Sequence, residues 1–351
     1  MIVNQWLPAA HLGDAVGDSA RRMRGILRGM GHEAEVYALT IDDVLAGDVL
    51  PFSDPASTGG DVTILHFAIP SPMTDAFARL PRGRVLLYHN VTPASFFAPY
   101  DIALFRMASL ARQELAGLVG KVDVALGVSD YNRRELESLG FDRTGVLPLA
   151  VDWSRVTKPV SLPALESVLD DEFVNFLFVG RIAPNKKIED HIRMAEHYKR
   201  YVDAFYRFIF VGRVDAVPQY YSVIRALMSE FQLPHDRFIF TGPVSDDELA
   251  VYYRRAAVYI SLSEHEGFCA PLVEAMAAGV PVLAYAAAAV PETLGGAGVQ
   301  FAPKDLEYAA EMAGSLAFDD DLRARVIAGQ RARLADFGEA RIIHSLETIL
   351  T

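Results

Sequence analysis

Short apolar runs alternate with amphipathic stretches along the whole chain, which is typical of parallel strands joined by helices. In the first half the apolar runs cover residues 1–7, 32–39, 61–67, 84–88, 122–128 and 145–149. The pattern restarts in the second half, with apolar runs at residues 173–179, 206–211, 238–241, 257–262 and 280–284. The sequence therefore predicts an α/β protein made of two Rossmann-like, doubly wound domains facing a cleft.

Helices are predicted between these strands, and several begin at a capping residue. They cover residues 18–30, 101–119, 129–139, 188–201, 217–231 and 245–255. Ser129 is the expected N-cap of one helix, and Ser245 with Glu248 forms a capping box at another. The loop Pro8–Gly17, which contains Gly13, joins the first strand to the first helix. Such a loop lets backbone N–H groups approach a ligand, although alone it is weak evidence.

The chain has 351 residues, enough for two α/β domains. Trp153–Val168 carries two prolines and little periodicity, so we expect it to connect the domains. The predicted domains are residues 1–155 and residues 170–330. Residues 331–351 are expected to form a C-terminal helix that packs back on the first domain.

Composition narrows the choice of partner and compartment. A formal net charge of −12 argues against general nucleic-acid binding, and a single cysteine fits a reducing compartment. The start of the chain lacks the features of a signal peptide, and no apolar run reaches the length of a membrane span. We therefore expect a cytoplasmic protein. Four arginines of the first helix, Arg21, Arg22, Arg24 and Arg28, form either a solvated face or a weak contact with the inner membrane surface.

The stretch Ser261–Val282 is the most informative part of the sequence. It leaves a buried strand, crosses a polar turn and enters a small-residue helix, with Pro271 expected at the first helical position. Glu266 falls in the turn and Glu274 in the first helical turn, beside free N–H groups that can receive a phosphate. One carboxylate can then hold ribose hydroxyls while the other faces a sugar. Alternatively, Glu274 only favours the helix dipole, and Glu266 is a solvated loop residue.

Cations follow an earlier strand of the same half. Arg181 and Lys186 come just after residues 173–179, and two fixed cations beside a helix N-terminus can balance a leaving diphosphate without a metal ion. Alternatively, both are surface loop cations. Cys269 has no convincing base nearby and indicates a small buried residue, not a nucleophile. The acidic cluster Asp319–Asp321 has no histidine near it, so we predict no metal site.

Two histidines stand at the carboxyl ends of strands in the first half. His66 and His89 close the segments 61–67 and 84–88, at the sheet edge where ligands of open α/β sheets bind. A histidine there can hydrogen-bond a sugar hydroxyl or a phosphate oxygen. Alternatively, each caps the following turn through backbone bonds.

The segments VGRIAPNKKIED and SEHEGFCAPLVEAMAAGVPV resemble the donor domain of family-4 retaining glycosyltransferases of GT-B fold. The resemblance implies that Arg181 and Lys186 hold the donor diphosphate, Glu274 the ribose and Glu266 the donor sugar. It also implies a further set of roles. By this resemblance, His89 is expected at the reaction centre, and Gly13 and Asp14 in a loop over the phosphate. Arg213 and Val244 are expected to line the site of the base. The backbone amides of Phe268, Cys269 and Ala270 are expected to contact the sugar and the phosphates.

The sequence departs from the family pattern in three places. Asp14 and Ala15 stand where many members carry two glycines, Cys269 stands where glycine is commoner, and Leu149–Ala150 replaces the usual Asn-Gly. These departures weaken the roles assigned to the first loop and to residue 149.

The resemblance implies transfer of a hexosyl group from a UDP- or GDP-sugar to a glycan or lipid-linked acceptor, as in polysaccharide biosynthesis. No cofactor and no divalent metal are expected, because the nucleotide-sugar is a co-substrate. A sugar phosphorylase of the same fold and a non-catalytic nucleotide-sugar sensor remain alternatives. The sequence leaves open the base, the sugar, the acceptor, the linkage and the oligomeric state.

Overall fold

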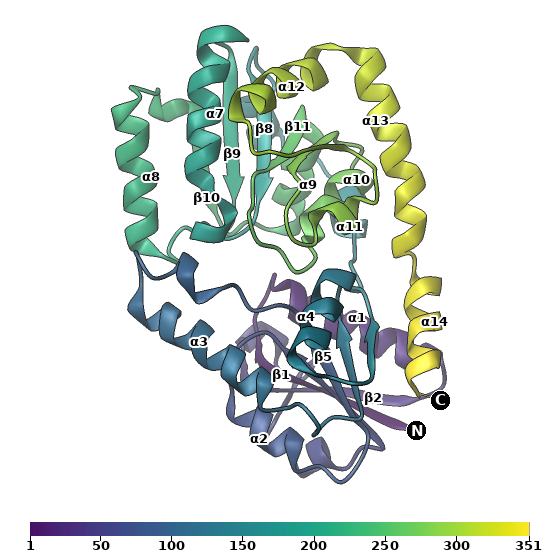
Figure 1. Cartoon of the computed structure of the whole chain (residues 1–351). Helices are drawn as coiled ribbons and strands as arrows, with labels where there is room; N and C mark the ends of the chain where they lie inside the picture. Colours follow the sequence, from purple (N-terminus) through teal and green to yellow (C-terminus); the bar gives the residue numbers. More distant parts are fainter. Residues whose placement is uncertain (351) are drawn as a thin grey trace. The chain divides into compact units, whose positions relative to one another are not determined.

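The computed structural model describes residues 1–350, which divide into two compact units. The first unit comprises residues 1–98, 102–152 and the chain from residue 336 onward. The second unit comprises residues 99–101 and 153–335. Each unit contains one fully parallel sheet, so the predicted α/β architecture with two Rossmann-like domains is confirmed (Figure 1).

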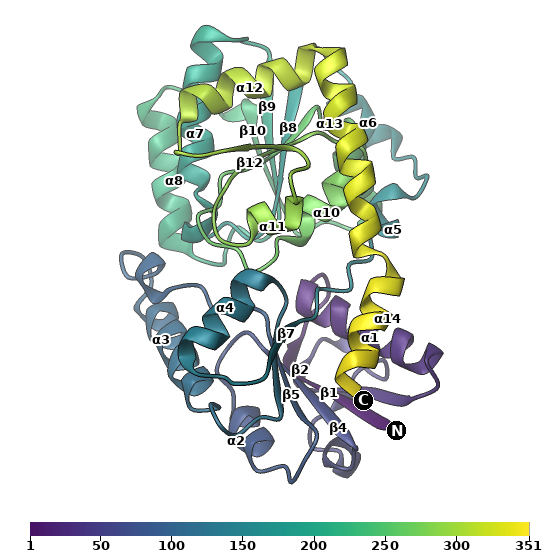
Figure 2. The same cartoon turned by 45° about the vertical axis from the view of Figure 1, so that its right-hand side comes forward.

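The first unit has a seven-stranded sheet of order β3-β2-β1-β4-β5-β6-β7. Its strands are β1 (Ile2–Ala10), β2 (Glu33–Ile41), β3 (Leu50–Pro51), β4 (Val62–Phe67), β5 (Arg84–Tyr88), β6 (Val124–Gly127) and β7 (Thr144–Val146). Its helices are α1 (Ala15–Gly29), α2 (Pro72–Ala78), α3 (Ile102–Ala116), α4 (Asp130–Leu139) and α14 (Glu339–Leu350). The order reverses beside β1, so β1, β4 and β5 lie next to one another, as Figure 2 shows.

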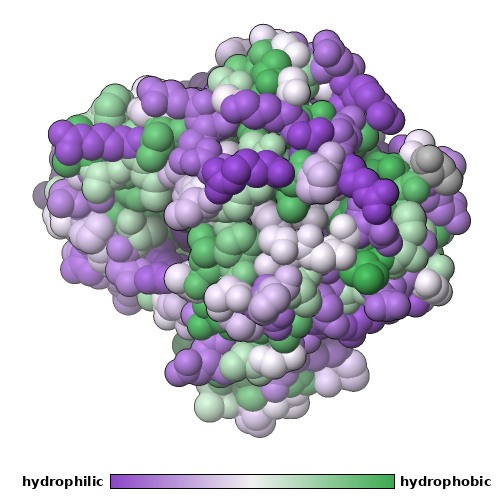
Figure 3. Space-filling view, turned by 90° about the horizontal axis from the view of Figure 1, so that it is seen from below, coloured by the Kyte–Doolittle hydropathy of each residue, from purple (hydrophilic) through white to green (hydrophobic). Residues whose placement is uncertain are grey.

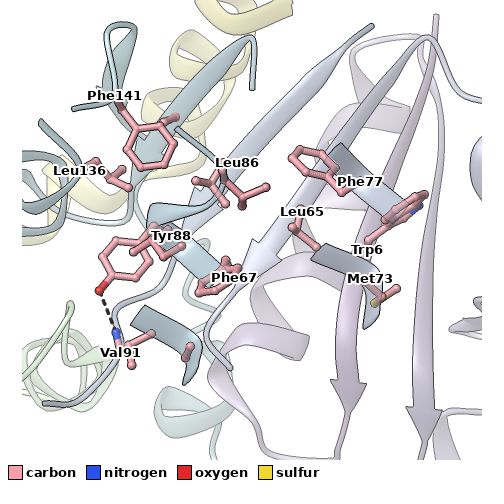
Figure 4. Packing of buried hydrophobic residues seen from close by; sticks show 14 of the residues in the cluster. Trp6, Leu65, Phe67, Met73, Phe77, Leu86, Tyr88, Val91, Leu136 and Phe141 are labelled. Carbon is pink, nitrogen blue, oxygen red and sulfur yellow. Dashed lines mark hydrogen bonds between the residues drawn. The ribbon is translucent and has the colours of Figure 1, made fainter. Parts of the chain in front are cut away.

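Alternating side chains of the central strands build the core of the first unit. Leu65 and Phe67 of β4 and Leu86 and Tyr88 of β5 are almost fully buried, together with Trp6 of β1. Figure 4 shows these side chains packed with residues of α2 and α4. Burial of each large apolar side chain contributes about 1.5–3 kcal/mol, so this cluster holds the strand ends at fixed positions.

The second unit has a six-stranded sheet of order β10-β9-β8-β11-β12-β13. Its strands are β8 (Val174–Val179), β9 (Tyr206–Val211), β10 (Phe238–Gly242), β11 (Val258–Ser261), β12 (Val282–Tyr285) and β13 (Val299–Phe301). Its helices are α5 (Ser154–Thr157), α6 (Pro163–Leu169), α7 (Ile188–Tyr201), α8 (Pro218–Glu230), α9 (Asp246–Arg255), α10 (Ala270–Ala277), α11 (Val290–Leu294), α12 (Leu306–Phe318) and α13 (Asp320–Arg333).

The helices of the second unit form two packed groups. One group contains α7, α8 and α12, and the other contains α5, α6, α9, α10 and α13. The sheet lies between the groups in both views (Figures 1 and 2). Because all strands of this sheet are parallel, their carboxyl ends and the loops that follow them lie at one edge of this unit.

Several predicted boundaries differ from the structure. The loop predicted at 8–17 is shorter, because β1 continues to Ala10 and α1 begins after Asp14, whose carboxylate accepts a 3.2 Å bond from the amide of Gly17. The predicted connection 153–168 is largely helical. Pro163 starts α6, and both α5 and α6 pack on α9 within the second unit. The predicted boundary at residue 331 falls inside α13, and the C-terminal helix α14 begins at Glu339 and packs against α1.

No helix among residues 1–350 is long and apolar enough to cross a membrane. On the face of the molecule shown in Figure 3, hydrophilic and hydrophobic residues are interspersed.

Candidate functional site

The loops that follow β8 and β9 are locked together at the edge of the second sheet. Gly180 and Gly212 have φ values of +153° and +134°, and a Cβ added at Gly212 would lie 2.3 Å from the Gly180 carbonyl oxygen. The amide of Ile182 donates to the carbonyl of Arg213 at 2.9 Å. Only glycine permits such a close approach of the two backbones. This contact fixes the start of the segment that carries Lys186.

Asn185 ties this segment to the turn after β11. Its buried side-chain amide donates to the backbone carbonyl of His265 at 3.0 Å. The backbone carbonyl of Asn185 accepts from the backbone amide of Glu264 at 2.9 Å. Since both bonds are sheltered from water, the two loops are held in one register. Asn185 has no role in the sequence prediction, although its position within VGRIAPNKKIED could have drawn attention to it.

Lys186 and Glu266 meet as a result. The ammonium Nζ lies 2.6 Å from Oε1 and 2.7 Å from Oε2 of Glu266, and the two side chains are 19% and 8% exposed. The sequence placed both residues at the donor site, and the structure brings them into direct contact. An ammonium has three N–H donors, so one remains for a ligand after the carboxylate has taken two.

Helix α10 begins beside this ion pair. Cys269 is its N-cap, in the left-handed conformation with φ +71°, and the cap makes no side-chain hydrogen bond. Among the described residues, nothing accepts a hydrogen bond from the amides of Cys269 and Ala270. Pro271 is the second helical residue, one position later than predicted, because Ala270 already has helical geometry. The turn therefore presents open N–H groups at the positive end of a helix.

The environment of Cys269 keeps its thiol neutral. Burial raises the pKa of the Cys269 thiol well above 9.0, and the nearby Glu266 carboxylate raises it further. A neutral buried thiol is a poor nucleophile. The positive φ also accounts for the glycine that is commoner at this position in the resembling family, because glycine adopts that conformation without a Cβ clash.

Glu274 is more enclosed than the sequence indicated. It is 1% exposed, one carboxylate oxygen accepts from the Nε of Arg155 at 2.9 Å, and the other accepts from the hydroxyl of Tyr253 at 3.0 Å. A second guanidinium nitrogen of Arg155 also bonds this carboxylate. Neither partner was predicted. Arg155 lies 119 residues away in the chain, within the segment taken as a connection, so no local pattern pointed to it.

Other predicted contacts of the second unit do not join this cluster. Arg181 is exposed and forms no ion pair within residues 1–350. Arg213 is also exposed and binds the carboxylate of Asp215 at 3.1 Å, which lowers the pKa of Asp215. Val244 is half-buried between β10 and the capping residue Ser245. These side chains lie in the loops after β8, β9 and β10.

The predicted site residues of the first unit separate into two groups. Gly13 and Asp14 form the exposed turn before α1, with Gly13 at φ +75° and Asp14 as the N-cap. His89 follows β5 at the carboxyl edge of the sheet. His66 lies inside β4 and not after it, so its side chain is fully buried. The expectation that both histidines end their strands therefore holds for His89 alone.

The two histidines are in direct contact. His66 Nδ1 lies 2.9 Å from His89 Nε2, and His66 Nε2 lies 3.0 Å from Oε1 of Gln5. Burial lowers the pKa of His66 to about 3. Burial, and repulsion from His66, also lower the pKa of His89 well below 6.5. Both rings are therefore neutral at physiological pH. The sequence did not predict the role of Gln5 or the contact between His66 and His89. Alternation along one strand does not show which side chains of neighbouring strands meet.

The arginines of α1 are balanced by acidic side chains. Arg21 binds Asp18 at 2.7 Å, Arg28 binds Glu35 at 2.5 Å, and Arg24 binds Asp48. Arg22 lies 3.1 Å from Asp152. The positive charge of these arginines is therefore balanced within the fold, and a contact with anionic lipid stays an untested prediction.

Comparison with known proteins shows that the sequence around this site matches a known family. Residues 166–333 match the family described as Glycosyl transferases group 1. This domain belongs to that family. The two parallel sheets of the chain are those of two Rossmann-like domains, so the predicted GT-B fold class is confirmed, and the match of residues 166–333 confirms a glycosyltransferase domain. The narrower assignment to family-4 retaining enzymes stays a prediction.

Three relatives show the extent of the similarity. The serotype-specific mannosyltransferase WbdA of Escherichia coli is 28% identical over 176 residues, which are 50% of this chain and 21% of WbdA. The D-inositol 3-phosphate glycosyltransferase of Xylanimonas cellulosilytica is 30% identical over 261 residues, which are 68% of this chain and 61% of that enzyme. Anabaena Alr3699/HepE, in complex with UDP and glucose, superimposes with a TM-score of 0.74 at 17% identity, covering 100% of this chain and 99% of that one. The chain thus spans about a fifth of the length of WbdA.

Proposed function

We propose that the protein is a glycosyltransferase that moves a hexosyl group from a nucleoside diphosphate sugar to a hydroxyl of a glycan or lipid-linked acceptor, with retention of the anomeric configuration. The observation that carries the proposal is the meeting of Lys186 and Glu266 beside the open amides of Cys269 and Ala270. This arrangement lies within a domain of the glycosyl transferases group 1 family, whose relatives act on saccharides.

The donor is proposed to bind with its diphosphate at the start of α10. The two free amides and the third N–H of Lys186 supply hydrogen bonds for phosphate oxygens, and the helix dipole favours their negative charge. Glu266 orients the sugar, and Glu274 receives the ribose. HepE, which was solved with UDP and glucose, supports a UDP-sugar, whereas mannosyltransferase relatives keep a GDP-sugar in consideration.

In the proposed reaction, the bond from the anomeric carbon to the diphosphate oxygen breaks, and a bond to the acceptor oxygen forms on the same face of the sugar. The leaving phosphate oxygen takes the proton of the acceptor hydroxyl. Lys186, Arg181 and the amides stabilise the negative charge that develops on the diphosphate. Glu266 holds the sugar without forming a covalent bond to it.

The ion pair also serves catalysis in this proposal. Because Glu266 pairs with Lys186 in the ligand-free state, attraction to the carboxylate offsets part of the cost of holding the ammonium in a largely buried position. The arriving diphosphate adds negative charge to the site. Arg181, exposed and unpaired within residues 1–350, is the cation that can move to compensate it.

The test is a donor screen on the purified chain. UDP-glucose, UDP-galactose, UDP-N-acetylglucosamine and GDP-mannose are each supplied, and nucleoside diphosphate release and sugar transfer to mixed glycan acceptors are measured by mass spectrometry. We expect one donor to be consumed, with the same rate in excess EDTA. Loss of activity in EDTA would contradict metal independence.

Two other outcomes would overturn the assignment. Donor breakdown that requires inorganic phosphate and yields a sugar phosphate would indicate a phosphorylase. Nucleotide-sugar binding in calorimetry, without transfer or hydrolysis under any acceptor, would indicate a sensor. Retention is tested separately by determining the anomeric configuration of the product by NMR.

A further inference from the structure

A row of hydrogen bonds crosses three adjacent strands of the first unit and ends at His89. It begins in α1, where the carbonyl of Ala20 accepts from Nε2 of Gln5 at 3.0 Å. A carbonyl oxygen has no proton to donate, so the amide nitrogen of Gln5 must face it. Rotating the amide would set two oxygens against each other and leave a buried acceptor unpaired. The Oε1 atom of Gln5 is therefore fixed on the opposite side, toward β4.

Gln5 Oε1 determines the tautomer of His66. The oxygen can only accept, and it lies 3.0 Å from His66 Nε2, so that nitrogen carries a proton. The ring is fully buried and its pKa is lowered to about 3, which keeps it neutral. A neutral imidazole has one protonated nitrogen. His66 Nδ1 is consequently a lone-pair acceptor.

His66 in turn determines the tautomer of His89. Its Nδ1 lone pair lies 2.9 Å from Nε2 of His89, so Nε2 of His89 must donate. The rings stack with centroids 5.1 Å apart, and the His89 amide donates to the carbonyl of Phe67 at 2.9 Å, which fixes the backbone beside the ring. The remaining nitrogen, Nδ1, has no hydrogen-bond partner within residues 1–350.

We infer that Gln5 and His66 are positioning residues that hold His89 with its proton on Nε2 and a lone pair on Nδ1, so that His89 binds substrate as a hydrogen-bond acceptor. Such a nitrogen can accept from a sugar or acceptor hydroxyl. It cannot donate to a phosphate oxygen, which at neutral pH is itself an acceptor. The ligand part of this inference rests on the proposed function, whereas the tautomer follows from the first unit alone.

The three residues come from neighbouring strands, which explains why the row exists. Gln5 is on β1, His66 on β4 and His89 directly after β5, and β4 pairs with both other strands (Figure 2). A buried polar side chain without a partner costs about 1–3 kcal/mol, so a partly satisfied row would destabilise the sheet. Every polar atom of the row except His89 Nδ1 has a partner. The exception is at the carboxyl edge, where ligands bind.

The first experiment measures the tautomer directly on the ligand-free full chain. The histidine side chains are labelled with nitrogen-15, and ring nitrogens are assigned from the signals lost in His66→Phe and His89→Asn. We expect Nε2 to be protonated and Nδ1 unprotonated in both rings at neutral pH. A proton on Nδ1 of His89, or a charged His89 ring, would overturn the inference.

The second experiment reverses the row. Gln5→Glu places a carboxylate, which has no donor, beside His66 and favours a second proton on that ring. His66 Nδ1 then donates, His89 Nε2 must accept, and the His89 proton moves to Nδ1. We expect this reversal in the nitrogen-15 spectrum, together with a loss of about 10–100-fold in kcat/KM for transfer, the range found for residues that orient metal-ligating histidines.

Matched variants separate this effect from general damage to the sheet. His66→Phe keeps a stacked ring without nitrogens, so both tautomers of His89 become populated. Thr63→Val changes a buried residue of the same strand without touching the row and should leave both tautomer and kcat/KM unchanged. A reversed His89 with undiminished transfer would overturn the positioning role. If His66→Phe does not fold, the wild-type and Gln5→Glu spectra still decide the tautomer.

Ligand titration tests the hydroxyl preference. The intact nucleotide-sugar should shift the His89 Nδ1 signal, and the nucleoside diphosphate alone should not. An equal shift with both ligands would overturn the acceptor role. An intact tautomer in a chain that transfers no sugar would contradict the proposed function and leave the tautomer inference standing.

Discussion

At the scale of single residues, the two buried carboxylates of the candidate donor site are already paired with cations in the ligand-free chain. Glu266 holds Lys186, and Glu274 holds Arg155. Both carboxylates are buried, and removing the partner of a buried charge is strongly destabilising because the charge is left uncompensated. Variants of these residues therefore change stability as well as activity, and each test needs a control for folding.

Lys186→Ala should lower turnover by about a hundredfold or more, because one electrostatic contact to the developing charge on the diphosphate is lost. Steady-state release of the nucleoside diphosphate measures the effect. Lys199→Ala, at an exposed position of α7, should leave turnover unchanged. The double variant Lys186→Ala/Glu266→Gln removes the uncompensated carboxylate, so recovery of stability in it would show that the unpaired charge is what destabilises Lys186→Ala. Full activity of Lys186→Ala would contradict the role.

At position 269, a glycine variant should be more stable than an alanine variant, which is the reverse of their usual order in helices. A non-glycine residue in the left-handed region costs about 1–2 kcal/mol, whereas glycine adopts φ +71° freely. We therefore expect Cys269→Gly to be more stable than Cys269→Ala by about 1 kcal/mol. Urea unfolding followed by Trp153 fluorescence, with Trp6→Phe in both variants, measures the second unit. A more stable alanine variant would show that the conformation carries no strain.

At the scale of elements, capping residues determine where the helices begin. Ser129 accepts from the amide of Asn132 at 3.2 Å, and Asp14 does the same for α1. Ser245 and Glu248 form the complete capping box of α9, with 2.8 Å bonds from the amide and the hydroxyl of Ser245 to Glu248. These bonds satisfy amides that the helix itself leaves without acceptors.

The capping box of α9 should make a pH-dependent contribution to stability. Hydrogen bonds from Ser245 lower the pKa of Glu248 below its ordinary 4.5 in the folded chain. A lowered folded-state pKa means that the stabilisation is present above pH 4.5 and is lost as pH falls through the folded-state value. Compared with Glu248→Gln, the wild type should therefore be more stable at neutral pH and equally stable at about pH 3. Urea unfolding across this range measures the difference.

Two further variants complete that test. Ser245→Ala should cost about 1 kcal/mol at neutral pH, because the cap is lost. Ser222→Ala, in the exposed part of α8, should change stability by less than about 0.5 kcal/mol. A difference between wild type and Glu248→Gln that does not vary with pH would show that the charge of Glu248 contributes nothing.

At the scale of the whole molecule, each unit carries buried neutral histidines. His66 and His89 belong to the first unit, and His191 belongs to the second. His191 is fully buried, and burial lowers its pKa to about 4. In the unfolded chain these rings would titrate near 6.5.

Both units should therefore lose stability in mild acid. The folded-state pKa values are lowered, so between about pH 6.5 and pH 4 the unfolded chain binds more protons than the folded chain, and stability falls as pH falls. Each histidine contributes a slope of up to about 1.4 kcal/mol per pH unit. Urea unfolding followed by Trp6 or by Trp153 alone measures each unit, and a flat profile between pH 6.5 and pH 5 would contradict the expectation.

The predictability of the elements depended on their length and pattern. The bounds of β5, β9 and α7 agree with the sequence prediction, because each combines a clear apolar pattern with a polar or glycine boundary. β3 and β13 were missed, since strands of two and three residues carry too little periodicity to be seen. Proline in the segment 153–168 was read as a break, but proline at the first turn of a helix is compatible with α6.

The candidate site was predictable only in part. The spacing within two motifs placed Lys186, Glu266 and the start of α10 at one sheet edge, and the structure brings these together. The exposed Arg181 shows that belonging to the same motif does not ensure a fixed contact. Glu274 illustrates the opposite case, because its partner Arg155 lies in a distant segment that no motif includes.

The sequence by itself predicted the longer strands and helices, the capping residues at which several helices begin, and the family of the second domain. These properties depend on periodicity, caps and short motifs, all of which act within a few residues along the chain. Only the tertiary structure decided which polar side chains meet. Glu274 with Arg155, and the row of Gln5, His66 and His89, are joined by strand order and burial. Exclusion of water then requires each buried donor and acceptor to find a partner, wherever that partner lies in the sequence.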